Sequence, residues 1–227
     1  LLYLLARISD TIADSGSSGG EDLLELLEDY NNRAQGHSNY MPDFSNLSDV
    51  QENPAEGLLL RGAHGPIELL EEASAVDQEL IRRCLDIIIS GQRMDLERFQ
   101  DKDGTGIRSL SRYEEMDDYA YRVAGSVGEF WTEICLEHAF EASAELKEEL
   151  MSSGVRFGKA LQLINILRDI PEDLEIGRCY IPTDDLEKIG LSPNDLLLPD
   201  SIDAFRPLLD QYIARAGEHL DEAVRYI

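Results

Sequence analysis

Two stripes of polar side chains interrupt two of the most apolar segments of this 227-residue chain. In residues 158–182 the stripe members are spaced three, four and four apart. At about 100° per residue, this spacing places them on one helical face roughly 80° wide. Burying amides and carboxylates is costly unless they bind something, and a hard cation such as Mg²⁺ prefers these oxygens. The members are Gln162, Asn165, Asp169 and Asp173.

A second stripe lies near the N-terminus, where the spacing is four, three and four and the neighbours are apolar. Its members are Tyr3, Arg7, Asp10 and Asp14. Both stripes contain Asp-x-x-x-Asp with an arginine close to the first aspartate. Facing carboxylate pairs would chelate two or three Mg²⁺ ions holding a diphosphate, and arginine forks would complete the grip on the phosphates. Apolar walls would suit a hydrocarbon tail and exclude water.

The net charge of −26 argues against nucleic acid and anionic membrane surfaces as general partners. A strongly solvated surface is the simplest origin of most of this charge. It also means that an anionic substrate needs metal ions or a local arginine cluster to reach the site. With 43% hydrophobic residues, the chain is expected to form one domain over residues 1–227. No stretch reaches 18 uninterrupted apolar residues, so the sequence predicts no transmembrane segment.

The three cysteines are scattered, odd in number and without the spacing of a metal site. This pattern predicts buried thiols in a reducing, cytoplasmic setting. The first residues, LLYLLARISD, are too short and too soon charged for a signal peptide and look like a helix already under way. We therefore expect further segments beyond one or both ends.

Helical patterns dominate the chain and predict an all-α fold. Residues 101–106, DKDGTG, begin like a calcium loop, but Arg112 stands where the loop needs glutamate, so that interpretation is rejected. Ser111 and Glu114 predict a capping box, and Thr183 predicts the cap of a short helix. The expected helices are 1–13, 21–33, 66–99 (one interrupted helix or two), 111–136, 142–150, 158–168, a short one near 183, and 201–227.

Four segments together resemble the squalene/phytoene synthase family, the head-to-head (1′-1) isoprenyl diphosphate synthases. ARISDTIADS (residues 6–15) resembles the first aspartate-rich motif of that family, and ALQLINILRDIPEDLEIGRCYIP (160–182) resembles the second. DDYAYRVAGSVGEF (117–130) is similar to a signature between them, with Ala120 where the family has cysteine. SGQRMDLERF (90–99) also resembles sequences of this family.

The resemblance implies an isoprenoid-synthase-type helical bundle around a central apolar cavity. It implies that Asp10, Asp14, Asn165, Asp169 and Asp173 bind Mg²⁺. It also implies that Tyr3, Arg7, Gln162 and Arg168 contact the prenyl diphosphate, with Arg178 and Tyr180 as weaker candidates. Tyr119 matches a tyrosine that assists cation steering or proton removal, and Gly125 and Gly128 would allow close passage of helices or substrate tails.

Simpler alternatives stay open for some of these residues. Tyr119 would also serve as an ordinary tyrosine at the edge of the core, and Arg178 would pair with Glu172 or Glu175. Gly128 would serve helix packing alone. Pro171 removes a helix N–H and is expected to disturb the position of Asp173.

The implied reaction joins two prenyl diphosphates through a cyclopropylcarbinyl diphosphate. The overall pattern favours a squalene synthase-like enzyme that uses farnesyl diphosphate and NADPH. The alternative is a phytoene or dehydrosqualene synthase, which loses a proton instead, and a more remote one is a non-catalytic helical paralogue. The hydrocarbon product leaves room for peripheral membrane contact during its release.

Overall fold

The structure is a computed structural model that describes every residue except 16–21, 100–105, 225 and 227. The described residues divide into two compact units, Leu1–Glu97 and Arg98–Ile227. Helices dominate both units, so the all-α prediction is confirmed. The prediction of one domain over residues 1–227 stays a prediction. Within the described residues, no helix is both long enough and apolar enough to cross a membrane.

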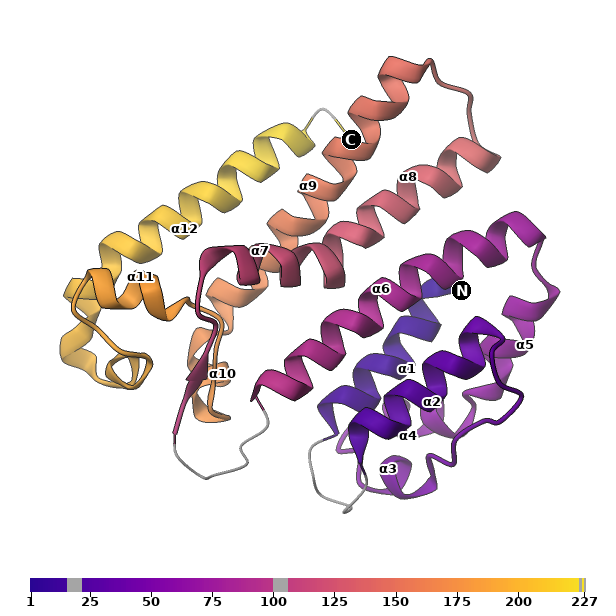
Figure 1. The fold of residues 1–227 in the computed structure, drawn as a ribbon, viewed down its shortest axis with the longest axis horizontal. Helices are drawn as coiled ribbons and strands as arrows, with labels where there is room; N and C mark the ends of the chain where they lie inside the picture. The colour runs from indigo at the N-terminus through magenta and orange to yellow at the C-terminus, as the bar shows by residue number, and fades with distance from the viewer. Residues whose placement is uncertain (16–21, 100–105, 225, 227) are drawn as a thin grey trace. The chain divides into compact units, whose positions relative to one another are not determined.

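The described part of the first unit is helical (Figure 1). Its elements are α1 (Leu2–Asp14), α2 (Leu23–Gln35), α3 (Ser45–Asp49), α4 (Pro54–Arg61), α5 (His64–Glu72) and α6 (Ala75–Phe99), the last of which ends just beyond the unit.

The core of the first unit forms around the apolar stripe of α1. Leu5, Ile8 and Ile12 are completely buried there, as their helical spacing predicts. Tyr30 of α2 is also buried, and its hydroxyl donates a hydrogen bond to the carbonyl oxygen of Leu5 over 3.0 Å. The side chain of Asp22 caps α2 by accepting from two backbone N–H groups. These contacts fix the helix that carries the first aspartate motif.

The second unit contains one short strand pair among its helices. Its elements are β1 (Arg108–Ser109), α7 (Tyr113–Ala120), the π-helical turn η1 (Tyr121–Gly125), α8 (Ser126–His138), α9 (Ala144–Arg168), α10 (Ile170–Glu175), β2 (Arg178–Cys179), α11 (Thr183–Lys188), the 3₁₀ turns η2 (Pro193–Leu197) and η3 (Pro199–Ser201), and α12 (Ile202–Ala223).

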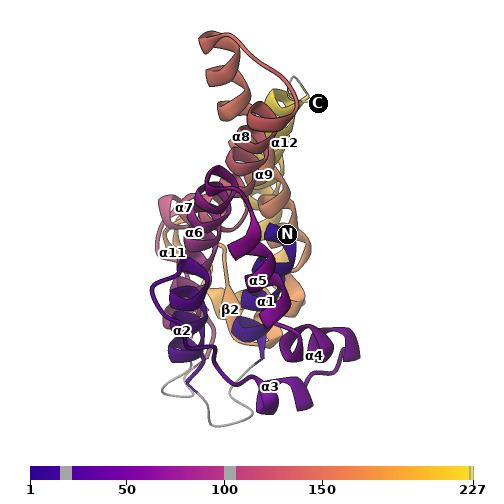
Figure 2. The same ribbon diagram turned by 90° about the vertical axis from the view of Figure 1, so that its right-hand side faces the viewer.

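Helix α9 packs against both α8 and α12, and the three run side by side in two views (Figure 1, Figure 2). Glycines let α9 approach α8 and η1 at backbone distance. A Cβ built on Gly128 would lie 1.9 Å from the carbonyl oxygen of Gly154, and one on Gly158 would lie 2.1 Å from that of Ala124. Neither position therefore tolerates a side chain without a shift of the helices.

The strands β1 and β2 pair in parallel, with Arg108 opposite Arg178 and Ser109 opposite Cys179. This ribbon was not predicted, because two-residue strands carry too few side chains for an alternating pattern. It fixes the chain directly after the second aspartate motif, since the N–H of Arg108 donates to the carbonyl of Gly177 over 2.9 Å.

Several predicted helix boundaries were wrong. The expected helices at 142–150 and 158–168 form one helix, α9, because Gly154 and Gly158 serve interhelical packing and do not break it. The predicted capping box of Ser111 and Glu114 does not form, since Glu115 accepts from the N–H of Ser111 instead. Thr183 is the first residue of α11 and not its cap. Residues 101–105 of the rejected calcium loop lie outside the described residues.

Candidate active site

The first aspartate motif lies on α1 in the first unit. Asp10 is partly buried and Asp14 is exposed. The Nε2 of Gln92, on α6, donates a hydrogen bond to Oδ1 of Asp10 over 2.5 Å. Burial, helped by the negative charge of Asp14, raises the pKa of Asp10 to about 6, although Gln92 and Arg7 act in the opposite direction. Asp10 therefore bears a negative charge that its surroundings only partly stabilise.

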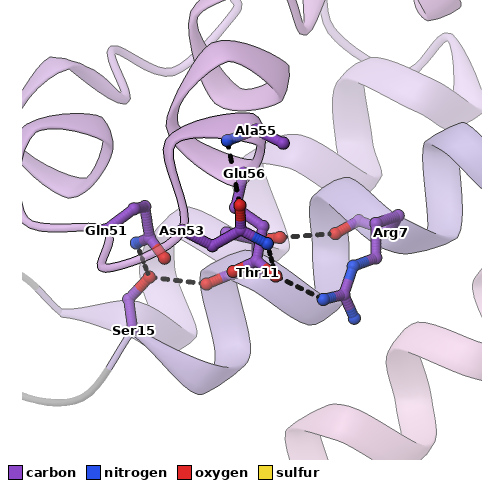
Figure 3. Close-up of polar contacts among 7 residues, drawn as sticks. All are labelled: Arg7, Thr11, Ser15, Gln51, Asn53, Ala55 and Glu56. Atoms are coloured by element: carbon purple, nitrogen blue, oxygen red, sulfur yellow. Dashed lines mark hydrogen bonds and ion pairs between the residues drawn. The ribbon is translucent and has the colours of Figure 1, made fainter.

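Arg7 and Tyr3, the predicted diphosphate contacts of α1, differ in their surroundings. The Arg7 guanidinium donates to Oε1 of Glu56 at 2.5 Å, in α4 of the same unit (Figure 3). Tyr3 is 75% exposed and stands away from the core. In this structure, Arg7 is thus held by a carboxylate, whereas Tyr3 is open to a ligand.

A network of hydrogen bonds fixes the C-terminal half of α1 against the segment that leads into α4 (Figure 3). The hydroxyl of Ser15 donates to the carbonyl of Thr11 and accepts from Nε2 of Gln51 over 2.8 Å. Asn53 donates to Glu56 and caps α4 by accepting from the N–H of Ala55. The helix that carries Asp10 and Asp14 is therefore positioned by polar contacts as well as by its apolar stripe.

The second aspartate motif spans the end of α9 and the start of α10 in the second unit. As expected from Pro171, the helix is interrupted, because α9 ends at Arg168 and α10 begins at Ile170. Two backbone hydrogen bonds nevertheless keep the four-residue register: Asp169 N–H donates to Asn165 and Asp173 N–H donates to Asp169, each over 2.9 Å. Asp173 thus follows Asp169 by one turn despite the break.

Arg168 and Asp169 form a two-pronged ion pair, with both N···O distances at 2.6 Å. The hydrogen bonds from Arg168 lower the pKa of Asp169. The side chain of Arg168 is 65% exposed and that of Asp169 is 38% exposed. The arginine predicted to grip a diphosphate therefore neutralises the adjacent predicted metal ligand in this structure.

Tyr119 and Tyr180, predicted from separate motifs, meet in the second unit. Their rings stack with centroids 5.0 Å apart, and the Tyr180 hydroxyl lies 3.5 Å from that of Tyr119. Tyr180 is buried against Phe99, whereas Tyr119 is partly buried. Arg178, two residues before Tyr180, lies in the parallel ribbon. The structure thus brings the weaker candidate Tyr180 directly beside Tyr119.

A pocket of about 700 Å³ opens in the second unit between η1, α8 and α9. Its lining is mostly apolar, and three large apolar side chains in it are exposed: Val127, Trp131 and Leu161. Gln162 and Asn165 supply amide groups on the α9 side, whereas Phe157 lies two turns earlier on that helix. The π-helical turn η1 borders the pocket, and such turns are frequent at functional sites.

The predicted ligands are divided between the units: Asp10 and Asp14 in the first, Asn165, Asp169 and Asp173 in the second. Over the described ranges, no group of three or more His, Cys, Asp or Glu side chains gathers closely enough to hold a metal ion. The metal assignment stays a prediction. Sequence reasoning missed Gln92 and Trp131, although SGQRMDLERF contains Gln92 and DDYAYRVAGSVGEF ends beside Trp131.

Helices that carry two Asp-x-x-x-Asp motifs, together with an apolar pocket, are typical of the isoprenoid synthase class of proteins. The family model described as squalene/phytoene synthase matches residues 1–227. The chain therefore belongs to the squalene/phytoene synthase family, and the resemblance seen in its motifs is confirmed.

Curated relatives agree with this assignment, and a solved structure has a similar fold. The chain is 36% identical to 15-cis-phytoene synthase of Synechocystis sp. over 144 residues, which is 62% of this chain and 40% of the relative. It is 34% identical over 173 residues to the chloroplastic phytoene synthase 1 of Arabidopsis thaliana, covering 73% of this chain and 37% of the relative. The solved structure of TcSQS with a ligand matches with a TM-score of 0.75 and 22% identity, over 99% of this chain and 61% of that chain.

The structural match establishes the isoprenoid synthase fold, as the sequence predicted. The chain spans only about 40% of the length of the curated relatives that it matches.

Proposed function

We propose that this protein joins two prenyl diphosphates head to head through a cyclopropylcarbinyl diphosphate, as a phytoene synthase-type enzyme acting on geranylgeranyl diphosphate. Family membership supports the reaction class. The curated relatives named above are phytoene synthases, so they favour this alternative over the squalene-type enzyme that the sequence analysis preferred. On this proposal the last cation loses a proton, and NADPH is not required.

The apolar pocket of the second unit is the observation that carries the proposal. Exposed apolar side chains gathered around a hollow indicate a binding site for an apolar ligand. Trp131 is 60% exposed and Leu161 is 45% exposed in this pocket. Along α9 the lining changes from Phe157 and Leu161 to Gln162 and Asn165, and Asp169 follows one turn later. A hydrocarbon tail with a charged head matches this order.

The donor set of both aspartate motifs fits Mg²⁺, since carboxylate and amide oxygens are its preferred ligands. In the first motif, Asp10 is partly buried beside the like charge of Asp14, so a cation would stabilise both. Asp10, Asp14, Asn165, Asp169 and Asp173 would hold the metal ions. When bound, the metal would neutralise the charge of the departing diphosphate. The net charge of −26 makes such cations important for binding an anionic substrate.

The remaining residues bind, orient and exclude water. Tyr3 and Arg7 on α1, and Gln162, Arg168, Arg178 and Tyr180 in the second unit, would contact the diphosphate groups. The pocket wall of Val127 and Trp131 would keep water from a carbocation. Tyr119 would present its hydroxyl, oriented by the stacked ring of Tyr180, to the reacting carbons as a proton acceptor or cation-steering group.

Product analysis tests the proposal directly. The protein is incubated with geranylgeranyl or farnesyl diphosphate and Mg²⁺, with and without NADPH, and the hydrocarbon is identified by mass spectrometry. We expect phytoene from geranylgeranyl diphosphate without NADPH. Squalene formed only with NADPH would overturn the phytoene proposal in favour of a squalene synthase-like enzyme. Absence of diphosphate release from both substrates would overturn the enzyme assignment.

Substitution of one aspartate in each motif tests the site. We expect Asp10→Asn and Asp169→Asn each to lower turnover by more than about 100-fold, since even outer-shell partners of a metal cost 10–100-fold. Circular dichroism should show that the fold persists. Asp203→Asn, an exposed aspartate in α12, is the matched control and should keep the wild-type rate. Wild-type rates in both motif variants would refute the metal assignment.

A further inference from the structure

Gln92 is a buried polar side chain that contacts the first aspartate motif. It lies on α6 with only 6% of its surface exposed. Its Nε2 donates to Oδ1 of Asp10. Its Oε1 is buried and has no hydrogen-bond partner among the residues that the structure describes. One end of this amide is thus committed to Asp10, while the other end is unsatisfied.

A buried amide oxygen without a partner destabilises the fold, and native proteins keep few of them. An apolar side chain of similar size, such as methionine, would fill the same space without this penalty. The oxygen and nitrogen of an amide group are bonded to the same carbon. Because Nε2 donates to Asp10, Oε1 also lies near the Asp10 carboxylate. The unsatisfied oxygen therefore points to a donor that arrives together with the ligand of Asp10.

We propose that Gln92 is a positioning residue for a divalent cation at Asp10. Its N–H group fixes one carboxylate oxygen of Asp10 and leaves the other oxygen for the cation. Its Oε1 accepts a hydrogen bond from a water molecule in the cation's hydration shell. Mg²⁺ usually keeps several waters, and such outer-shell partners orient ligands and raise affinity. This inference rests on the proposed function, because it deepens the role of the same Asp10.

The test compares cation binding by Gln92→Met with that of the wild-type chain. Methionine keeps the length and volume of the side chain but removes both polar atoms. Gln35→Met is the matched control: Gln35 lies on α2 of the same unit, and its Nε2 donates to the carbonyl of Arg82 and not to an aspartate. The probe is Mn²⁺ with inorganic pyrophosphate, and the loss of the free Mn²⁺ signal in electron paramagnetic resonance reports binding.

We expect Gln92→Met to bind Mn²⁺ about 10- to 100-fold more weakly than the wild type. Gln35→Met should bind with wild-type affinity. Without metal, the thermal midpoint of Gln92→Met should stay close to that of the wild type, because removal of the unsatisfied Oε1 offsets loss of the hydrogen bond to the Asp10 carboxylate. A purely structural role for Gln92 would give the reverse result: a lower midpoint and unchanged affinity.

Two further variants keep the outcomes distinct. Gln92→Asn retains the amide but withdraws it by one methylene, so it should also weaken cation binding. It takes the place of Gln92→Met in the test if that variant does not fold. Asp10→Asn should weaken binding most. If Asp10→Asn weakens binding and both Gln92 variants bind like the wild type, the role of Gln92 is refuted and the metal site stands. If Asp10→Asn also binds Mn²⁺ like the wild type, both the metal site at Asp10 and the role of Gln92 are refuted.

Discussion

Helices α1 and α9 each carry an aspartate motif, but the two units hold them by different means. Helix α1 is fixed by side-chain polar contacts: the Arg7–Glu56 ion pair, the Ser15–Gln51 hydrogen bond and Gln92 on Asp10. Helix α9 approaches α8 and η1 at backbone distance through its glycines, and its Lys159 adds an ion pair with Asp117 of α7 over 2.7 Å.

The electrostatics of the two motifs differ in the same way. Asp10 is partly buried and its pKa is raised to about 6, whereas Arg168 lowers the pKa of Asp169, whose side chain is 38% exposed. A carboxylate that is poorly stabilised as an anion gains most from a cation. We therefore expect the first motif to depend on a cation more strongly than the second.

The largest effect is expected where backbones touch. Gly128→Val should destabilise the second unit by more than about 3 kcal/mol, because overpacking costs up to that amount even between side chains. The added atoms would meet the carbonyl oxygen of Gly154, which cannot rotate away. Thermal unfolding, with circular dichroism as the probe, measures the loss.

Gly217 on α12 is the matched control for this substitution. Apart from the neighbouring backbone of α12 itself, none of the described residues places an atom within 4 Å of a Cβ built there. Gly217→Ala should therefore stabilise the protein by about 0.5–1 kcal/mol through helix propensity. A similar loss in both variants would show that the close approach of α8 and α9 does not hold the unit together.

Two buried tyrosines offer the next contrast. The hydroxyl of Tyr212 in the second unit donates to Oδ2 of Asp185 at 2.5 Å, whereas that of Tyr30 in the first unit donates to a neutral carbonyl. Burial raises the pKa of Asp185, but hydrogen bonds from Lys188 and Tyr212 outweigh it, so the pKa of this carboxyl is lowered. Tyr212→Phe should cost about 1.5–3 kcal/mol at neutral pH, and Tyr30→Phe about 1 kcal/mol.

The two losses should differ in their pH dependence. A carboxyl whose pKa is lower in the folded state adds stability above its unfolded pKa of about 3.9, and this stability is lost as pH falls through the folded pKa. The deficit of Tyr212→Phe should therefore shrink below about pH 4, while that of Tyr30→Phe stays constant. Chemical denaturation from pH 7 to pH 3.5 measures both, and parallel deficits would contradict the charged hydrogen bond.

The aspartates themselves should respond with opposite signs. Asp10→Asn should raise the stability of the metal-free protein by about 0.5–2 kcal/mol, as substitutions at strained functional positions do. Asp169→Asn should lower it slightly, because it removes the partner of Arg168. Thermal midpoints in the presence of a chelator measure both changes. Losses of equal size in the two variants would remove the contrast between the motifs.

The sequence predicted the helical class and the residues of both motifs because these rest on local information. Helical spacing identifies the apolar faces of α1 and α9 directly. The interruption at Asp169 was also expected, since Pro171 lacks an N–H group. Local patterns therefore sufficed wherever one segment determines its own conformation.

The sequence did not predict contacts between distant segments. Gln92 lies 82 residues from Asp10, and nothing in SGQRMDLERF shows that its amide reaches α1. The continuous α9 was missed for the same reason, because the glycines at 154 and 158 look like helix breakers until α8 is packed against them. The strand pair needed the partner 70 residues away to be recognised.

The smallest effect should come from the ion pair that holds Arg7. Glu56→Gln keeps an acceptor for the Arg7 guanidinium but removes the charge. Because Arg7 is 40% exposed and Glu56 is 23% exposed, the loss should stay below about 1 kcal/mol and should vanish at 1 M salt, where screening acts within about 3 Å. Asn53→Ala, which removes the cap of α4, should cost about 1 kcal/mol at any salt concentration. Thermal midpoints of both variants at low and high salt separate the two contributions. A loss of stability in Glu56→Gln that does not depend on salt would contradict a charge-based contribution of this ion pair. The hydrogen-bond geometry of the network, and not its charge, would then hold α1 and its Asp10 in place.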